Sequence, residues 1–160
     1  MIRSEAKKGS RHLEVTSIET GVDGSAPGEI MYLPAGPHVS ALTARLLQSD
    51  LEELQGRSVK PYIDFDHQGQ AAAADPKRFL WKPGEGVFLA LAWTRSGRAA
   101  VEGKDYRYFS PAFQIDDNGE PCGLPANGAI GALVNKPGPL PGSGWVPGES
   151  PPPRSWRARP

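Results

Sequence analysis

"YRYFSPAFQIDD", residues 106–117, places Ser110 and Pro111 inside a run of aromatic and β-forming residues. Aromatic residues at alternate positions are typical of a strand with one face in a protein core. A Ser-Pro pair also begins many turns, so Ser110 is either a solvated turn residue or a hydroxyl carried by a strand. The stretch itself predicts β-structure, and the sequence around it bears on the role of the serine.

Two helices are expected on either side of the chain's centre. "SALTARLLQSDLEELQG", residues 40–56, has Ser40 as a cap, leucines at helical spacing and Gly56 as a stop, which predicts one amphipathic helix. "SGRAAVEG", residues 96–103, predicts a second helix of about two turns.

Strands are expected between and after these helices. The nearly continuous apolar run at residues 87–93 is typical of a strand buried on both faces. The resulting order, β-α-β-β-α-β-β, lacks a regular βαβ repeat. The sequence therefore predicts an α+β fold in which a mostly antiparallel sheet or small barrel carries one main helix and a short second helix. The strand candidates are "SVKPYIDFDHQ" (58–68), "GVFLALAWT" (86–94), "DYRYFSPAFQID" (105–116) and "GAIGALVN" (128–135).

The two ends differ from the middle in composition. Residues 1–28 are polar and predict a partly flexible extension, with one strand candidate, "HLEVTSIE", that could pair at a sheet edge. Residues 137–160 hold eight prolines and four glycines, which oppose both helices and strand ladders. We therefore expect one domain at residues 29–137 and a disordered tail at 138–160.

Composition excludes several classes of partner and site. The 160 residues include 18 Lys and Arg against 18 Asp and Glu, so no global charge favours nucleic acid or an anionic membrane. Cys122 is the single cysteine, which rules out an internal disulfide and a cysteine-rich metal site. No apolar stretch approaches the roughly 20 residues of a membrane span. No partner of the nucleic-acid or membrane class is expected.

Of the three histidines, only His67 ends a predicted strand beside two carboxylates, Asp64 and Asp66. In a regular strand the two aspartates share one face and His67 points to the other, so neither is expected to orient its ring. This arrangement does not converge on a metal ion, and no metal or other cofactor is predicted.

His67 and Ser110 lie 43 residues apart on strands that a compact sheet or barrel could bring together. A hydroxyl beside an imidazole is the arrangement that nucleophilic catalysis needs. On spacing alone, the alternative that Ser110 is a solvated turn residue stays open.

Six motifs follow one another along the chain: "YLPAG", "YIDFDHQG", the Ala-rich "AAADPKRF", "WT", "YRYFSPAF" and "GALVNKPG". In this order they resemble the Mu-like prophage protease family, also labelled phage I-like protein. The resemblance covers roughly residues 30–140, with "RFLW" and "LVN" departing from the family's usual Gly-Trp and "LTN". It implies a capsid maturation, or prohead, serine protease, related to viral assembly proteases that pair a serine with a histidine on a β-barrel.

By this resemblance Ser110 takes the place of the nucleophile and His67 that of the general base. Related assembly proteases take a third residue from a strand beyond the serine, which points to Asn135 in "GALVNKPG" as the residue that orients His67. Asn135 could equally cap its strand before Pro137. The acidic residues of the turn after the serine strand, Asp116, Asp117 and Glu120, are the fallback candidates.

The implied substrates are scaffold and capsid proteins of the prohead, and the chain itself. The implied location is the bacterial cytoplasm, within the assembling prohead, and a homo-oligomer is compatible with that role. The competing hypothesis is a non-catalytic capsid-assembly or scaffold-associated module that retains the protease fold, with Ser110 as an ordinary strand residue.

Overall fold

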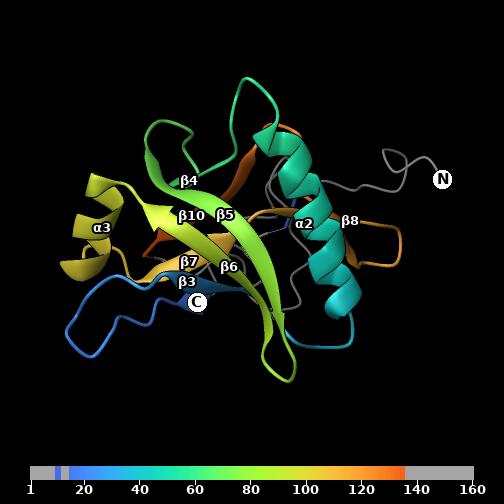
Figure 1. Cartoon of the computed structure of the whole chain (residues 1–160), viewed down its shortest axis with the longest axis horizontal. Coiled ribbons are helices and arrows are strands. Elements are labelled where there is room, and N and C mark those ends of the chain that lie inside the picture. Colours follow the sequence, from blue (N-terminus) through green and yellow to red (C-terminus); the bar gives the residue numbers. More distant parts are fainter. Residues whose placement is uncertain (1–9, 12–14, 136–160) are drawn as a thin grey trace, which may run out of the picture.

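The computed structural model describes residues 10–11 and 15–135, and the elements lie within these ranges (Figure 1). In chain order they are β1 (Ser10–Arg11), β2 (Thr16–Ser17), β3 (Glu29–Pro34), α2 (Ala41–Gln55), β4 (Tyr62–Phe65), β5 (Ala72–Lys82), β6 (Gly86–Trp93), α3 (Arg95–Glu102), β7 (Tyr108–Pro111), β8 (Phe113–Ile115), β9 (Pro121–Gly123) and β10 (Ala129–Val134).

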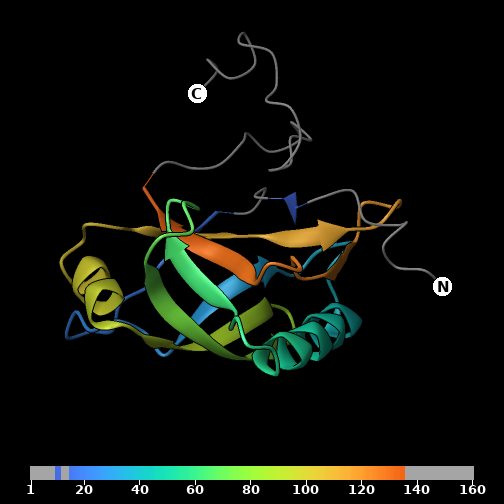
Figure 2. The ribbon, with the colours of Figure 1, turned by 90° about the horizontal axis from the view of Figure 1, so that it is seen from above.

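Seven strands form one curved sheet in the order β2-β7-β10-β4-β5-β6-β3, and β1, β8 and β9 form a smaller sheet (Figure 2). The sheet curls until its two edges meet, where Thr16 Oγ1 on β2 donates to the carbonyl of Met31 on β3 at 3.2 Å. The buried Tyr32 hydroxyl donates from β3 to the carbonyl oxygens of Ala112 and Ile130, each at 2.8 Å. These contacts make a nearly closed barrel, which confirms the predicted α+β class.

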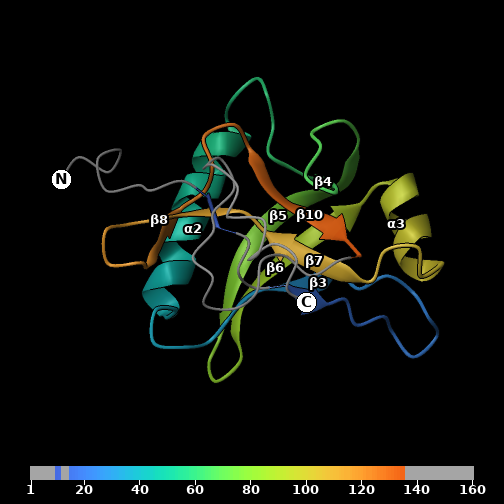
Figure 3. The same ribbon diagram turned by 180° about the vertical axis from the view of Figure 1, so that it is seen from behind.

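Every pairing in the larger sheet is antiparallel except that between β4 and β10. Strand β10 therefore lies between β4 on one side and β7 on the other (Figure 3). This places the strand that leads to His67 and the strand that carries Ser110 on either side of the same neighbour.

Helix α2 begins and ends where the sequence predicts. The Ser40 hydroxyl accepts from the main-chain N–H of Leu42 at 3.2 Å, and the Ser40 N–H donates to the Thr43 hydroxyl at 2.9 Å, which forms a capping box. Gly56 caps the other end. The helix buries Leu47, Leu51 and Leu54 against the barrel.

Helix α3 lies directly on strand β5. A Cβ atom added at Gly97 would come within 1.8 Å of the Ala73 carbonyl oxygen, so only glycine permits this approach. The Thr94 hydroxyl caps the helix by accepting from the Gly97 N–H at 3.0 Å. The second predicted helix is thus confirmed, and the two helices lie on opposite sides of the barrel (Figures 1 and 3).

Strand β5 is not among the strands that the sequence predicts, since the stretch after His67 is rich in alanine. Alanine has a low β-propensity, but Ala73 and Ala74 are fully buried, and Gly97 of α3 packs directly on the Ala73 main chain. Pro76 is accommodated because the pairing with β6 is irregular between Pro76 and Arg78. Strand β6 is also less buried than its apolar run predicted, since Ala92 is exposed.

The predicted termini are only partly within the described residues. Thr16 and Ser17 pair with β7 at the sheet edge, so part of the polar 1–28 segment joins the barrel, as its strand candidate indicated. The predicted disordered tail, 138–160, lies outside the described residues. The domain boundaries at 29 and 137 stay predictions.

Candidate active site

Ser110 is held in position by the strand ladder on which it lies. Strand β7 pairs with β10, where Ser110 lies opposite Ala132, and with β2 on its other side. The preceding residue, Phe109, is fully buried in the barrel and packs against Tyr32 with ring centroids 5.7 Å apart. Because side chains alternate along a strand, Ser110 faces the opposite side, and it is 2% exposed.

His67 lies in a turn rather than on a strand. Strand β4 ends at Phe65, and both Asp66 and His67 adopt the left-handed conformation, with φ of 58° and 57°. Aspartate and histidine tolerate this conformation better than most residues, but each still costs roughly 1–2 kcal/mol. The regular strand expected through His67 therefore stops two residues early, and the alternation of faces does not apply to its ring.

Several hydrogen bonds compensate for the strain in this turn. The Asp66 N–H donates to the Leu133 carbonyl of β10 at 2.9 Å, and the Gln68 N–H donates to the Phe65 carbonyl at 3.2 Å. The Asp64 carboxylate accepts from the Gly69 N–H at 2.6 Å. The turn is thus closed from both ends and fixed to the strand that also pairs with β7.

The two predicted catalytic side chains meet across β10. The Nε2 atom of His67 lies 3.0 Å from the Oγ atom of Ser110, although the residues are 43 positions apart. This separation is within hydrogen-bond distance, which is the geometry that a general base and its nucleophile require.

The surroundings of His67 favour its neutral form. Burial lowers the pKa of the imidazole from 6.5 to about 4, and the nearby Asp66 carboxylate acts in the opposite direction. At neutral pH the ring is therefore uncharged, and Nε2 can accept a proton when Nδ1 carries the ring hydrogen.

Asp64 supports the turn that carries His67. Its side chain is 1% exposed, and its second carboxylate oxygen, Oδ1, is buried with no hydrogen-bond partner among the described residues. Burial raises the pKa of this carboxyl, while main-chain hydrogen bonds from Gly69 and His67 oppose the increase. Asp64 therefore acts on the backbone around His67, a role that the strand interpretation did not give it.

Asp66 connects the turn to the chain that enters β7. The Tyr106 hydroxyl donates to Asp66 Oδ2 at 2.5 Å, and the rings of Tyr106 and Phe65 are 5.1 Å apart. This contact raises the pKa of Tyr106. The sequence does not predict this role for Tyr106, and the aromatic run around Ser110 is the one feature of the sequence that points to this segment.

Asn135 uses both polar atoms of its side chain on the same entering chain. Its Oδ1 accepts from the Arg107 N–H at 3.1 Å, and its Nδ2 donates to the Asp105 carbonyl at 2.6 Å. The orienting role implied for Asn135 stays a prediction, and these contacts favour a different role as an anchor for the segment before Ser110.

The fallback acidic residues lie in the turn between β8 and β9. Asp116 Oδ1 accepts from the N–H groups of Asn118 and Glu120, and Glu120 lies 3.5 Å from His38 Nδ1. Asp116 therefore stabilises its own turn, and Glu120 contacts a histidine that the sequence analysis left without a role.

Within residues 10–11 and 15–135, no cluster of three or more histidine, cysteine or acidic side chains able to bind a metal ion occurs. No helix in the same ranges is long and apolar enough to span a membrane.

Comparison with known proteins indicates the family of the chain. The family model described as Mu-like prophage I protein, N-terminal domain, matches residues 30–139, a range that includes both His67 and Ser110. No curated protein and no solved structure matches the chain. The family model spans more than half of the chain, so the chain belongs to the Mu-like prophage I protein family.

Proposed function

We propose that the chain is a phage serine endopeptidase of the prohead maturation type. The observation that carries this proposal is the 3.0 Å contact between His67 Nε2 and Ser110 Oγ, with the imidazole held in its basic form by burial. Membership of a prophage protein family supports a role in phage biology. The proposed substrates are the scaffold and capsid proteins of the prohead, and the chain itself.

The proposed mechanism needs one proton carrier and one nucleophile. His67 Nε2 accepts the hydroxyl proton as Ser110 Oγ attacks the scissile carbonyl, which forms a tetrahedral oxyanion. The protonated ring then donates to the leaving amine, and an acyl-enzyme remains on Ser110. Water, activated by the same ring, hydrolyses this ester and restores the hydroxyl.

The oxyanion needs main-chain donors that the residue after the nucleophile cannot supply. Pro111 has no N–H, so the donor that directly follows the serine in many hydrolases is missing. In the proposed mechanism the donors therefore belong to other segments of the chain.

The same contact admits a second function. Ser110 is only 2% exposed, and a buried serine bound to a histidine can serve as a purely structural hydrogen bond. A capsid-assembly module that retains the fold without catalysis would keep this bond and never form a covalent adduct.

Labelling with a fluorophosphonate probe separates the two functions. The catalytic proposal predicts an adduct on Ser110 in the purified chain, because the probe reacts with activated serine hydroxyls. Ser110→Ala and His67→Ala should each lower labelling by roughly four orders of magnitude or more, and the double variant should be hardly worse than either one. Ser49→Ala, on the exposed side of α2, is the matched control and should label normally.

A chain that folds but gives no adduct at Ser110 would overturn the protease and favour the binding module. Normal labelling of Ser110→Ala would show that another residue is the nucleophile.

A further inference from the structure

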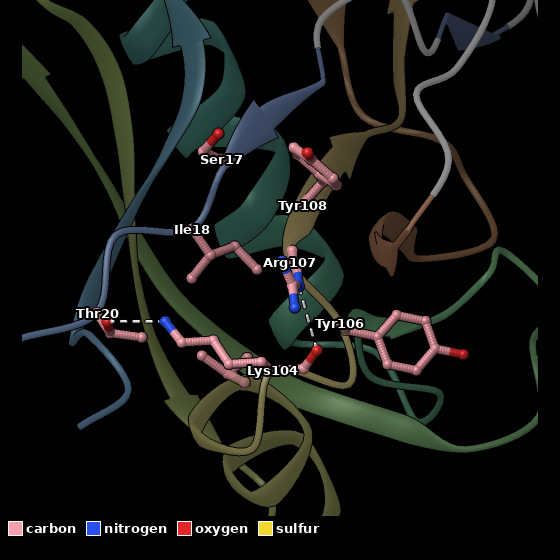
Figure 4. Close-up of a pocket in the computed structure, with 8 residues that line it drawn as sticks. Ser17, Ile18, Thr20, Lys104, Tyr106, Arg107 and Tyr108 are labelled. Atoms are coloured by element: carbon pink, nitrogen blue, oxygen red, sulfur yellow. Dashed lines mark hydrogen bonds between the residues drawn. The ribbon is translucent and has the colours of Figure 1, made fainter. Parts of the chain in front are cut away.

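A pocket of about 330 Å³ lies beside the chain that leads into β7 (Figure 4). One wall is formed by Ser17 and the residues that follow β2, including Thr20. The other wall is formed by the segment between α3 and β7, with Lys104, Arg107 and Tyr108. The pocket therefore lies between an edge strand and the strand of the proposed nucleophile.

The pocket is cationic. Lys104 and Arg107 are the charged residues among those that line it, and none of the lining residues is acidic. Lys104 Nζ reaches across to Thr20 Oγ1 at 3.4 Å, and Arg107 Nε donates to the Lys104 carbonyl at 3.4 Å (Figure 4). Both distances are at the long end for hydrogen bonds, so most of the donor capacity of the two cations is available to a ligand.

Another cation near the pocket is used differently. Arg98 on α3, the helix whose Val101 lines the pocket, lies 3.5 Å from the Glu102 carboxylate. Within residues 15–135, neither Lys104 nor Arg107 forms an ion pair with an acidic side chain. Two cations that have no carboxylate partner within this part of the chain thus face one pocket.

Lys104 also occupies a backbone position that favours glycine. It follows Gly103 at the end of α3 with φ of 64°, where its N–H donates to the Val101 carbonyl and the Asp105 N–H donates to the Ala100 carbonyl. This is the Schellman ending, in which glycine usually takes the left-handed position because a side chain there is strained. The Lys104 side chain is exposed, so packing does not explain why a lysine stands there.

The pocket is close to the proposed catalytic pair. Tyr108, which lines the pocket, precedes Ser110 by two residues and so lies on the same face of β7, roughly 7 Å away. Tyr106, which also lines the pocket, donates its hydroxyl to Asp66, the residue next to His67. A peptide that presents its scissile bond to Ser110 would therefore reach the pocket with a side chain a few residues away.

We propose that this pocket is a substrate subsite that binds the carboxylate of an Asp or Glu side chain located roughly three residues from the scissile bond. Lys104 supplies a point charge, and Arg107 supplies planar donors that match a carboxylate. The inference rests on the proposed protease function and adds a substrate preference to it.

The first test measures cleavage of a peptide library by the full chain, with mass spectrometry to locate the cut sites. We expect cuts to be enriched where Asp or Glu lies near the scissile bond, and a peptide with Glu at that position to be cleaved about tenfold to a hundredfold faster than its Gln counterpart. Lys104→Gly and Arg107→Gln should each reduce this ratio to about threefold or less.

The Lys104→Gly variant distinguishes loss of the subsite from loss of stability, because glycine relieves the strain of the left-handed backbone conformation. Its Tm should equal or exceed that of the unmodified chain while its preference for acidic residues falls. Arg45→Gln, which removes an exposed cation from α2, is the matched control and should keep the full preference. Cleavage with no acidic preference, or a preference that Lys104→Gly leaves unchanged, would overturn the subsite while the protease stands.

The second test does not depend on catalysis. The Ser110→Ala chain is immobilised, and the same library is passed over it. Acidic peptides should be enriched on the Ser110→Ala chain, and adding Lys104→Gly to that chain should abolish the enrichment. This result would support the subsite even if the unmodified chain cleaves no peptide, in which case only the protease proposal would be contradicted. Retention without enrichment, or no retention at all, would overturn the subsite.

Discussion

The strand that carries Ser110 and the turn that carries His67 are positioned by different means. Strand β7 is paired on both sides, and its inward residue, Phe109, is fully buried. The turn after β4 has two residues in the left-handed conformation and is held by side-chain contacts from Asp64 and Tyr106.

Because of this difference, the positions of Ser110 and His67 should respond differently to substitutions. The position of Ser110 depends on the cooperative stability of the barrel, so changes that move it should also lower the free energy of unfolding. The position of His67 depends on a few local contacts, so changes there should lower reactivity directly and cost less stability than the loss of a core contact in the barrel. Four variants or conditions test this contrast.

The largest expected effect is on the strand side. Phe109→Ala removes a fully buried ring from the barrel and should lower the free energy of unfolding by about 3–5 kcal/mol. Urea denaturation measures the loss. Phe88→Ala, at a half-buried position on β6, is the control and should cost less. A loss below about 1 kcal/mol for Phe109→Ala would show that β7 is not fixed by its core contact.

The next largest effect is expected in an acid titration of stability, which tests the turn that carries His67. Because the folded pKa of His67 is about 4 and the ordinary value is 6.5, the unfolded state binds the extra proton between these values. The contribution of His67 to the free energy of unfolding is fully present above pH 6.5. It is lost as the pH drops towards 4, by up to about 3 kcal/mol. His67→Gln should lack this part of the slope, whereas the unmodified chain should label with fluorophosphonate until the pH approaches 4.

If the stability of the two chains depended on pH with the same slope, burial would not lower the pKa of His67. A labelling rate that already declines near pH 6.5 would lead to the same conclusion.

Substitution of Asp64 tests whether the hydrogen bonds of the turn hold His67 in position. Asp64→Ala leaves the Gly69 N–H without its acceptor, which should lower the rate of Ser110 labelling about tenfold to a hundredfold and the stability by roughly 1–3 kcal/mol. Asp64→Asn keeps an acceptor oxygen and should restore most of the labelling rate. Equal loss of labelling in both variants would place the effect in the charge of Asp64 rather than in the turn.

Asn135 gives the smallest expected effect and decides between its two roles. Its contacts with Asp105 and Arg107 belong to the strand side, so Asn135→Ala should lower stability by about 1 kcal/mol and labelling by less than tenfold. The orienting role implied by family resemblance instead predicts a tenfold to hundredfold loss of turnover with unchanged Tm. Measuring both quantities on one preparation separates the two.

Local sequence signals predicted the elements whose determinants are local. Ser40 and Gly56 mark the ends of α2 because caps act on adjacent backbone groups, and the aromatic stretch around Ser110 predicted β7. The resemblance added the pairing of His67 with Ser110, which spacing alone left open.

The features that were missed depend on contacts distant in sequence. Strand β5 forms from alanines because α3 and the neighbouring strands cover them, and nothing within that stretch indicates it. The left-handed Asp66 and His67 are stabilised by Leu133 and Tyr106, which lie on other elements. The lysine at the end of α3 is unusual only once the backbone conformation is known.

The position of β10 has a consequence for when the chain can act. It joins the strand before His67 to the strand of Ser110, and it follows both in sequence. During synthesis the ribosome must release residues 129–134 before the two side chains can be brought together across them. A nascent chain that has not reached this point would carry both side chains without their contact, so the proposed proteolytic activity would begin only after the barrel has formed.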